Sequence, residues 1–245
     1  MKTCQEWSLK FDQYYNNIAS NKAPGLNEYE KSVLLSDAQD SIVLSLCNGT
    51  LGKAFESTEE VTNYLAPLIR QETWEEKETH AETEKIKKIA SPEFKVDDSS
   101  VVFSLPDDLF LRTYEQCFVN TDNCTNLPAI VLPVTQDELW RRRRSPFHRE
   151  TANRVLRLAF DDAQVSEGKL SSTKYSELIS SGTIKKYIVR YISRPEPIIL
   201  TNLHQINQEL DIRGKYEPKP CLLDEALHEA ILAEAVRLAK AIWQS

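Results

Sequence analysis

The sequence is poor in glycine, with 6 glycines among 245 residues. It has neither GxGxxG nor GxxxxGK followed by Ser or Thr, the patterns that cradle phosphate groups, which argues against a nucleotide-binding loop. Long apolar runs are also missing. None approaches the roughly 18 residues of a membrane-spanning helix, so we expect no contact with a membrane. The first fifteen residues lack the apolar centre of a secretory signal, and the protein is therefore expected to stay in the compartment where it is made.

Patterns for catalysis or metal binding are equally scarce. The histidines are far apart in the sequence, and CxxC, HExxH and GxSxG are all absent, which removes the usual signatures of a zinc site and of a serine nucleophile. The cysteines are odd in number and lack the spacing of a disulfide framework, so they are predicted to be reduced thiols. The sequence thus predicts a protein that is not an enzyme, with no metal and no cofactor. The histidines are His80, His148, His204 and His228, and the cysteines are Cys4, Cys47, Cys117, Cys124 and Cys221.

Positive charge is in deficit overall. The chain has 30 Lys and Arg residues against 37 Asp and Glu residues, a net charge of −7. This balance excludes a uniformly basic nucleic-acid binder but not a local basic patch. A hydrophobic content of 41% and a charged content of 27% are typical of a folded protein. The length fits one elaborated domain or two small ones.

The first third of the chain has the periodicity of helices. Apolar residues recur every three or four positions, which predicts amphipathic helices. One helix is marked by Trp7, Phe11, Tyr14 and Ile18. A second is expected from about Glu28 to Cys47, because Asn27 and Glu30 have the spacing of a capping box.

A third helix is predicted to start at a second capping box, Ser57 with Glu60. It should continue through Leu68 and Ile69, with a kink at Pro67. The acidic stretch that follows, 72–90, is polar and helix-prone, and we expect it to be solvated.

From about Phe94 the pattern changes to short apolar runs bounded by Pro, Asp and Asn, which are typical of strands. The last residues return to helical spacing, including Leu227 and Ile231. Because the strands are clustered rather than alternating with helices, the predicted fold class is α+β. We expect a helical bundle formed by 1–93 and 215–245, with an inserted antiparallel β-rich unit formed by 94–214.

One local feature is unusually sharp. Trp140 is followed by four consecutive arginines, Arg141, Arg142, Arg143 and Arg144. Like charges this close repel one another, so the run needs solvent or an anionic partner. Three interpretations are open: contact with nucleic-acid phosphates, pairing with an acidic surface of another subunit, or a solvated loop. Near the C-terminus, Trp243 on an apolar helix face is a candidate docking anchor, together with Leu227 and Ile231.

Several segments together resemble a virion structural protein of tailed phages related to the crAss-like phages. They are FDQYYNNIASNKAPGLNEYEKSVLLSDAQDSIV, STEEVTNYLAPLI, LPVTQDELWRRRRSPF, RVLRLAF, YSELISSGTIKKYIVRYISRPEPIIL and LHEAILAEAVRLA. Within that group the chain looks like a ring or adaptor protein of the neck, and the resemblance covers nearly the whole chain. The segments around APGLNEYEKS and RYISRPEPIIL are the most specific.

The resemblance implies a structural role without catalytic residues. It implies a head-to-tail connector made in the host cytoplasm and built into the virion between portal and tail. Identical copies would form a ring, expected to be a dodecamer matching the portal. The implied partners are further copies, the portal protein, other neck and tail proteins, and the packaged DNA passing through the lumen during ejection. The alternative from the residues alone is a DNA-binding module that uses the Arg141–Arg144 run.

Overall fold

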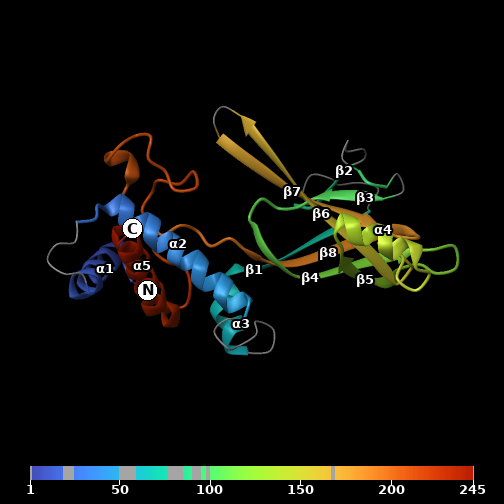
Figure 1. Cartoon of the computed structure of the whole chain (residues 1–245), viewed down its shortest axis with the longest axis horizontal. Coiled ribbons are helices and arrows are strands. Elements are labelled where there is room, and N and C mark those ends of the chain that lie inside the picture. Colours follow the sequence, from blue (N-terminus) through green and yellow to red (C-terminus); the bar gives the residue numbers. More distant parts are fainter. Residues whose placement is uncertain are drawn as a thin grey trace. The chain divides into compact units, whose positions relative to one another are not determined.

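The computed structural model describes residues 2–18, 25–49, 59–76, 85–89, 95–97, 100–166 and 169–244, although not the side chains of 17–18, 162–172 and 243–244. The chain divides into two compact units (Figure 1). Met1–Leu68 and Arg194–Ser245 form the helical unit, and Ile69–Ser193 form the sheet unit. The helical elements are α1 (Cys4–Ile18), α2 (Glu28–Cys47), α3 (Glu59–Leu65), the 3-10 turns η2 (Ala66–Leu68) and η3 (Leu203–Gln205), α4 (Gln136–Arg144) and α5 (Glu225–Gln244). The strands are β1 (Ile69–Glu75), β2 (Lys87–Ile89), β3 (Val101–Ser104), β4 (Leu109–Asn120), β5 (Leu127–Pro133), β6 (Arg154–Ser166), β7 (Lys169–Ile179) and β8 (Thr183–Ser193).

In the helical unit, α1 and α2 both pack against α5. The predicted start of α2 is confirmed: Asn27 Oδ1 accepts from Glu30 N, and Glu30 Oε2 accepts from Asn27 N, both at 2.8 Å. The helix ends at Cys47, as predicted, and Gly49 just beyond it adopts the left-handed conformation with a φ of 67°. Among the described side chains, the apolar face of α1 includes Trp7, Phe11 and Tyr15 rather than Tyr14, and the side chain of Ile18 lies outside the described residues.

Tyr14 instead faces a carboxylate on α5. Its hydroxyl donates to Glu229 at 2.6 Å, and Lys2 and Lys10 donate to the same side chain at 2.7 and 2.9 Å. Hydrogen bonds from Lys10, Lys2 and Tyr14 lower the pKa of Glu229 to about 2. This cluster connects the first helix of the chain to the last.

One face of α2 holds an extended segment, Glu196–Leu200, through side-chain hydrogen bonds. Ser36 Oγ accepts from Ile198 N at 3.0 Å, and Ser32 Oγ accepts from Leu200 N at 3.1 Å. Gln39 completes the row by donating to the carbonyl of Glu196 at 2.9 Å. Residues at i, i+4 and i+7 share one helix face, which is why three polar side chains serve successive backbone groups. Backbone groups of Glu196, Ile198 and Leu200 thus have hydrogen-bond partners although the segment does not belong to the sheet.

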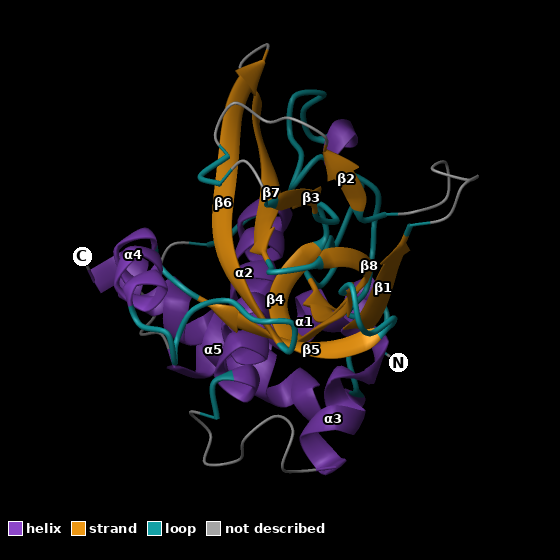
Figure 2. Cartoon of the chain, turned by 90° about the vertical axis from the view of Figure 1, so that its right-hand side faces the viewer, coloured by secondary structure: helices purple, strands orange, loops and turns teal. Residues whose placement is uncertain are grey.

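The sheet unit has, within the described residues, one eight-stranded sheet of order β1-β8-β4-β5-β6-β7-β3-β2. The sheet curls round until it nearly closes (Figure 2), and side chains from its two ends are in contact. Lys85, just before β2, pairs with Glu72 of β1 at 3.1 Å, and the Trp74 ring meets the Phe103 ring edge-on with centroids 4.9 Å apart. The interior includes Tyr187, Val189 and Tyr191, which alternate along β8 and therefore share one face of that strand.

Two expectations for this unit need correction. The sheet is mixed rather than antiparallel, because β5 and β6 run parallel, with Ile130 opposite Arg154. Parallel neighbours need a long crossover connection, and residues 134–153, which include α4, supply it. In addition, 69–75 and 87–89 are strands rather than helix. Pairing of β1 along the whole edge of β8 overrides the local helix preference of this acidic stretch.

The predicted third helix is shorter than expected. It ends at Leu65, and Pro67 lies in the 3-10 turn η2 that leads directly into β1. Ser57 lies outside the described residues, so the second capping box is not tested. The α+β class agrees with the structure. The division into a helical bundle and an inserted domain remains a prediction.

Candidate subunit interface

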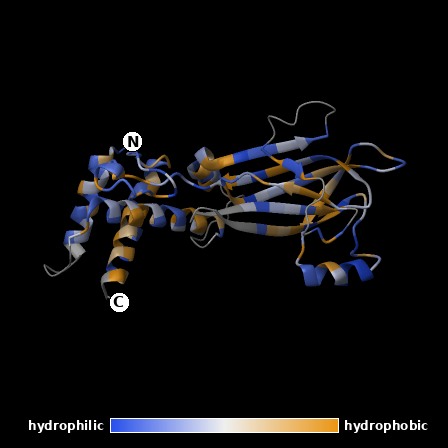
Figure 3. Ribbon diagram, turned by 90° about the horizontal axis from the view of Figure 1, so that it is seen from above, coloured by the Kyte–Doolittle hydropathy of each residue, from blue (hydrophilic) through white to orange (hydrophobic). Residues whose placement is uncertain are grey.

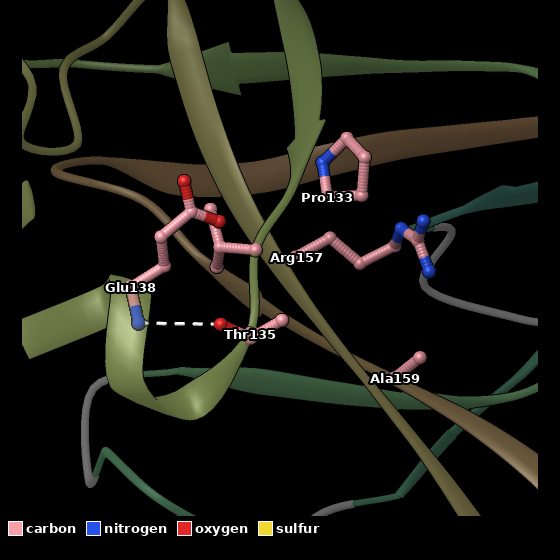
Figure 4. Close-up of a pocket in the computed structure, with 6 residues that line it drawn as sticks. Pro133, Thr135, Glu138, Arg157 and Ala159 are labelled. Carbon is pink, nitrogen blue, oxygen red and sulfur yellow. Dashed lines mark hydrogen bonds between the residues drawn. The ribbon is translucent and has the colours of Figure 1, made fainter.

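The arginine run lies in α4, the crossover helix between β5 and β6. Thr135 caps its first turn, with Oγ1 accepting from Glu138 N at 3.3 Å (Figure 4). Asp137 and Glu138 occupy the first turn, and the arginines occupy the last. Acidic residues near the N-terminus and basic residues near the C-terminus of a helix are favoured by its dipole. This arrangement helps the short helix to tolerate four adjacent cations.

Two of the four arginines are held within the chain. Arg142 pairs with Glu138 at 3.1 Å, one turn earlier in the helix. Arg143 pairs with Glu150 at 3.2 Å and also with Asp97. The helix is further anchored by Leu139, whose fully buried side chain packs in a cluster with Leu156, Leu158 and Ile179. Arg142 and Arg143 are therefore positioning residues for α4.

The other two arginines face away from the sheet. Arg141 and Arg144 are exposed, and neither has an ion-pair partner among the described residues. They share the outward face with Trp140, which is 55% exposed, and Phe147 just beyond the helix is 82% exposed. Figure 3 shows α4 as a largely hydrophilic helix at one edge of the sheet unit. We call Trp140, Arg141, Arg144 and Phe147 the α4 patch.

Phe147 did not figure in the predicted set. The sequence did contain a signal for its position. Pro146 follows the arginines, and because proline is common just after a helix ends, it indicates that Phe147 lies beyond the helix. Arg154 fixes this turn by donating to the Phe147 carbonyl at 2.6 Å. Asp97, which holds Arg143 from a distant segment, carried no such signal.

A small cavity of about 190 Å³ lies between the start of α4 and β6, lined in part by Thr135, Glu138 and Arg157 (Figure 4). Both of its charged side chains are engaged elsewhere. Glu138 pairs with Arg142, and the Nε atom of Arg157 lies 2.8 Å from Glu115. Burial raises the pKa of Glu115, which also accepts from the Tyr187 hydroxyl. The cavity therefore presents no unpaired charge to a ligand.

The predicted docking residues of α5 are placed differently from the arginines. Leu227 and Ile231 are buried, and their side chains belong to the interior of the helical unit. The side chain of Trp243 lies outside the described residues. Ile242, on the same last turn, is 68% exposed. A docking role for α5 remains a prediction, and the burial of Leu227 and Ile231 means that neither is available for it in this conformation.

The cysteines and histidines form no site in the described residues. All five cysteines are free thiols, and burial raises the pKa of Cys47 and of Cys221 to about 11. Within the described ranges, no group of three or more His, Cys, Asp or Glu side chains is arranged to hold a metal ion. In the same parts of the chain, no helix has the length and apolar character needed to cross a bilayer.

Comparison with known proteins places the whole chain in one group. Residues 1–245 match the family described as phage tail ring protein 3/4. The chain is 33% identical over 243 residues to ring protein 3 of Bacteroides phage crAss001, covering 97% of this chain and 94% of the relative. It is 34% identical over 247 residues to ring protein 4/5 of the same phage, covering 98% of this chain and 92% of the relative. The resemblance read from the sequence is thus confirmed: the chain belongs to the phage tail ring protein 3/4 family of crAss-like phages, whose members are structural ring proteins of the virion.

Proposed function

We propose that the protein is a ring-forming subunit of the head-to-tail connector, located between the portal and the tail. Identical copies surround the channel through which DNA leaves the particle, and their number matches a dodecameric portal. The observation that carries this proposal is the full-length match to ring proteins of a crAss-like phage. In this proposal, the helical unit contacts the portal and the sheet unit contacts the tail.

A ring of identical subunits closes through a head-to-tail interface, so each subunit needs two different and complementary surfaces. The α4 patch supplies a basic and aromatic surface. The helical unit supplies the opposite charge, with 17 acidic against 11 basic residues, whereas the sheet unit is nearly balanced at 20 against 19. A net negative subunit also suits a DNA channel, because basic walls would retain the passing duplex.

DNA binding by the arginine run is the weaker alternative. Arg142 and Arg143 are already paired with carboxylates, which leaves Arg141 and Arg144 to contact phosphate. Two cations are few for a phosphate-gripping module, since affinity for duplex DNA grows with the number of phosphates neutralised.

The proposal is tested by quantitative mass spectrometry of purified virions, counting this chain against the portal protein. We expect a ratio near one, because a portal-matched ring has one subunit for each portal subunit. Absence of the chain from particles would contradict the connector role. A ratio far from one would contradict the matched ring.

A further inference from the structure

Two surfaces of the chain complement each other in both charge and apolar character. The first is the α4 patch on the sheet unit. The second lies on the helical unit, in the loop between η3 and α5, and consists of Ile206, Glu209, Tyr216 and Glu217. We call this second set the acidic loop surface. All four of its residues are exposed, with Ile206 at 53% and Tyr216 at 38%.

The acidic loop surface is held in place by its own contacts. Leu203 N donates to the carbonyl of Tyr216 at 3.0 Å, and the rings of His204 and Tyr216 stack with centroids 3.7 Å apart. Lys215 and Lys219 are both paired with Glu196, so these two cations do not offset the negative charge of Glu209 and Glu217. The carboxylates of Glu209 and Glu217 have no partner among the described residues.

We infer that the α4 patch of one copy binds the acidic loop surface of the neighbouring copy, an inference that rests on the proposed ring. Arg141 and Arg144 meet Glu209 and Glu217, while Trp140 and Phe147 cover Ile206 and Tyr216. Arginine and aromatic residues are the types that most often dominate the energy of protein interfaces. The net charge of −6 on the helical unit also favours approach of the basic patch.

A second copy is a better occupant of the α4 patch than DNA is. Asp137 is exposed and lies one helical turn before Arg141, on the same face of α4, where it would repel a phosphate backbone. The same acid is tolerated at the rim of a protein interface, where a charge is solvated. Each copy also presents one surface of each kind, as a head-to-tail contact between identical copies requires.

The test supplies the chain from a plasmid to a phage that lacks the gene and counts copies per particle by mass spectrometry. Arg141→Glu with Arg144→Glu should reduce incorporation at least tenfold. Adding Glu209→Arg and Glu217→Arg to that variant should restore it, because both partners are then reversed. The matched control, Arg70→Glu with Arg190→Glu, makes the same change of charge at two exposed positions on β1 and β8 and should be incorporated normally. A thermal unfolding curve of each variant, monitored by circular dichroism, verifies that the variant is folded.

Each contrary outcome is distinct. Normal incorporation of the Arg141→Glu/Arg144→Glu variant overturns this inference alone, and so does failure of the fourfold variant to regain incorporation. Binding of a short DNA duplex by the unaltered protein at low salt, lost on Arg141→Ser with Arg144→Ser, assigns the patch to DNA and also overturns it. Failure of the unaltered chain to enter particles overturns the proposed function itself.

Discussion

At the scale of single residues, the four arginines of the run lie in two kinds of environment rather than one. Successive residues of a helix are rotated by about 100°, so four in a row cannot all face the same surroundings. Arg142 and Arg143 turn toward carboxylates of the chain, and Arg141 and Arg144 turn outward. The four consecutive arginines therefore divide into two that position the helix and two that are available to bind a partner.

This separation predicts different stability effects within the run. Arg143→Ala should lower the free energy of unfolding by about 1–2 kcal/mol, because two partly buried carboxylates, those of Asp97 and Glu150, lose their counter-charge. Arg141→Ala should change it by less than about 0.5 kcal/mol, as is usual for exposed positions. Urea denaturation of both variants measures the difference. Equal effects would mean that the pairing of Arg143 contributes nothing to folding.

At the scale of elements, the helices and strands with their own local signals are the ones that the sequence predicts. The capping box of Asn27 and Glu30 defines the start of α2, and the alternation of Tyr187, Val189 and Tyr191 defines β8. The strand β1 has no such signal, because its acidic residues favour helix and only pairing with β8 makes it a strand. The parallel pairing of β5 with β6 is likewise a property of the crossover, which local patterns do not encode.

The candidate site divides in the same way. Its composition could be read from the sequence, because four adjacent arginines need an anionic partner or solvent. The sequence could not show which of the four arginines are unpaired. The pairing of Arg143 depends on Asp97 and Glu150, and Asp97 comes from a distant segment. For α5, helical periodicity located Leu227 and Ile231 on one face but could not show that this face is covered by the chain's own helices.

The contact of α1 with α5 predicts a pH dependence. The pKa of Glu229 is lowered to about 2 in the folded protein, so its contribution is present above the ordinary carboxyl pKa and is lost as pH falls from about 4.5 toward 2. Glu229→Gln should therefore reduce stability at pH 6 and make little difference near pH 2. Since the side chain is half exposed, we expect the effect at pH 6 to be below about 1 kcal/mol.

Urea unfolding at the two pH values measures this effect. Glu209→Gln is the control, because that carboxylate has no partner among the described residues. A loss of stability in Glu229→Gln that is the same at pH 6 and pH 2 would show that the ion cluster is not its source.

At the scale of the whole molecule, the two units differ in how the chain builds them. The sheet unit is one continuous stretch, Ile69–Ser193, whereas the helical unit combines the two ends of the described chain. Ser36 and Ile198, which are hydrogen-bonded in the helical unit, are 162 residues apart in the sequence. A discontinuous unit of this kind depends on both of its segments.

This difference predicts how fragments behave. The isolated stretch 69–193 should fold cooperatively, because it contains every strand of the described sheet. The stretch 94–214 should be markedly less stable, because without β1 and β2 the core loses Trp74 and Ile86. Circular dichroism and urea unfolding of the two fragments provide the comparison. Equal stability of both fragments would show that these two strands are dispensable.

The discontinuous helical unit also sets an order of events during synthesis. The ribosome delivers α1 and α2 long before the Glu196–Leu200 segment and α5, so the sheet unit is finished while the helical unit still waits for its second half. A nascent chain that stops in between would carry the α4 patch without the acidic loop surface. In the proposed ring, such a product would offer one of the two contacting surfaces and lack the other. The apolar faces of α1 and α2, left without α5, would make it a target for chaperones.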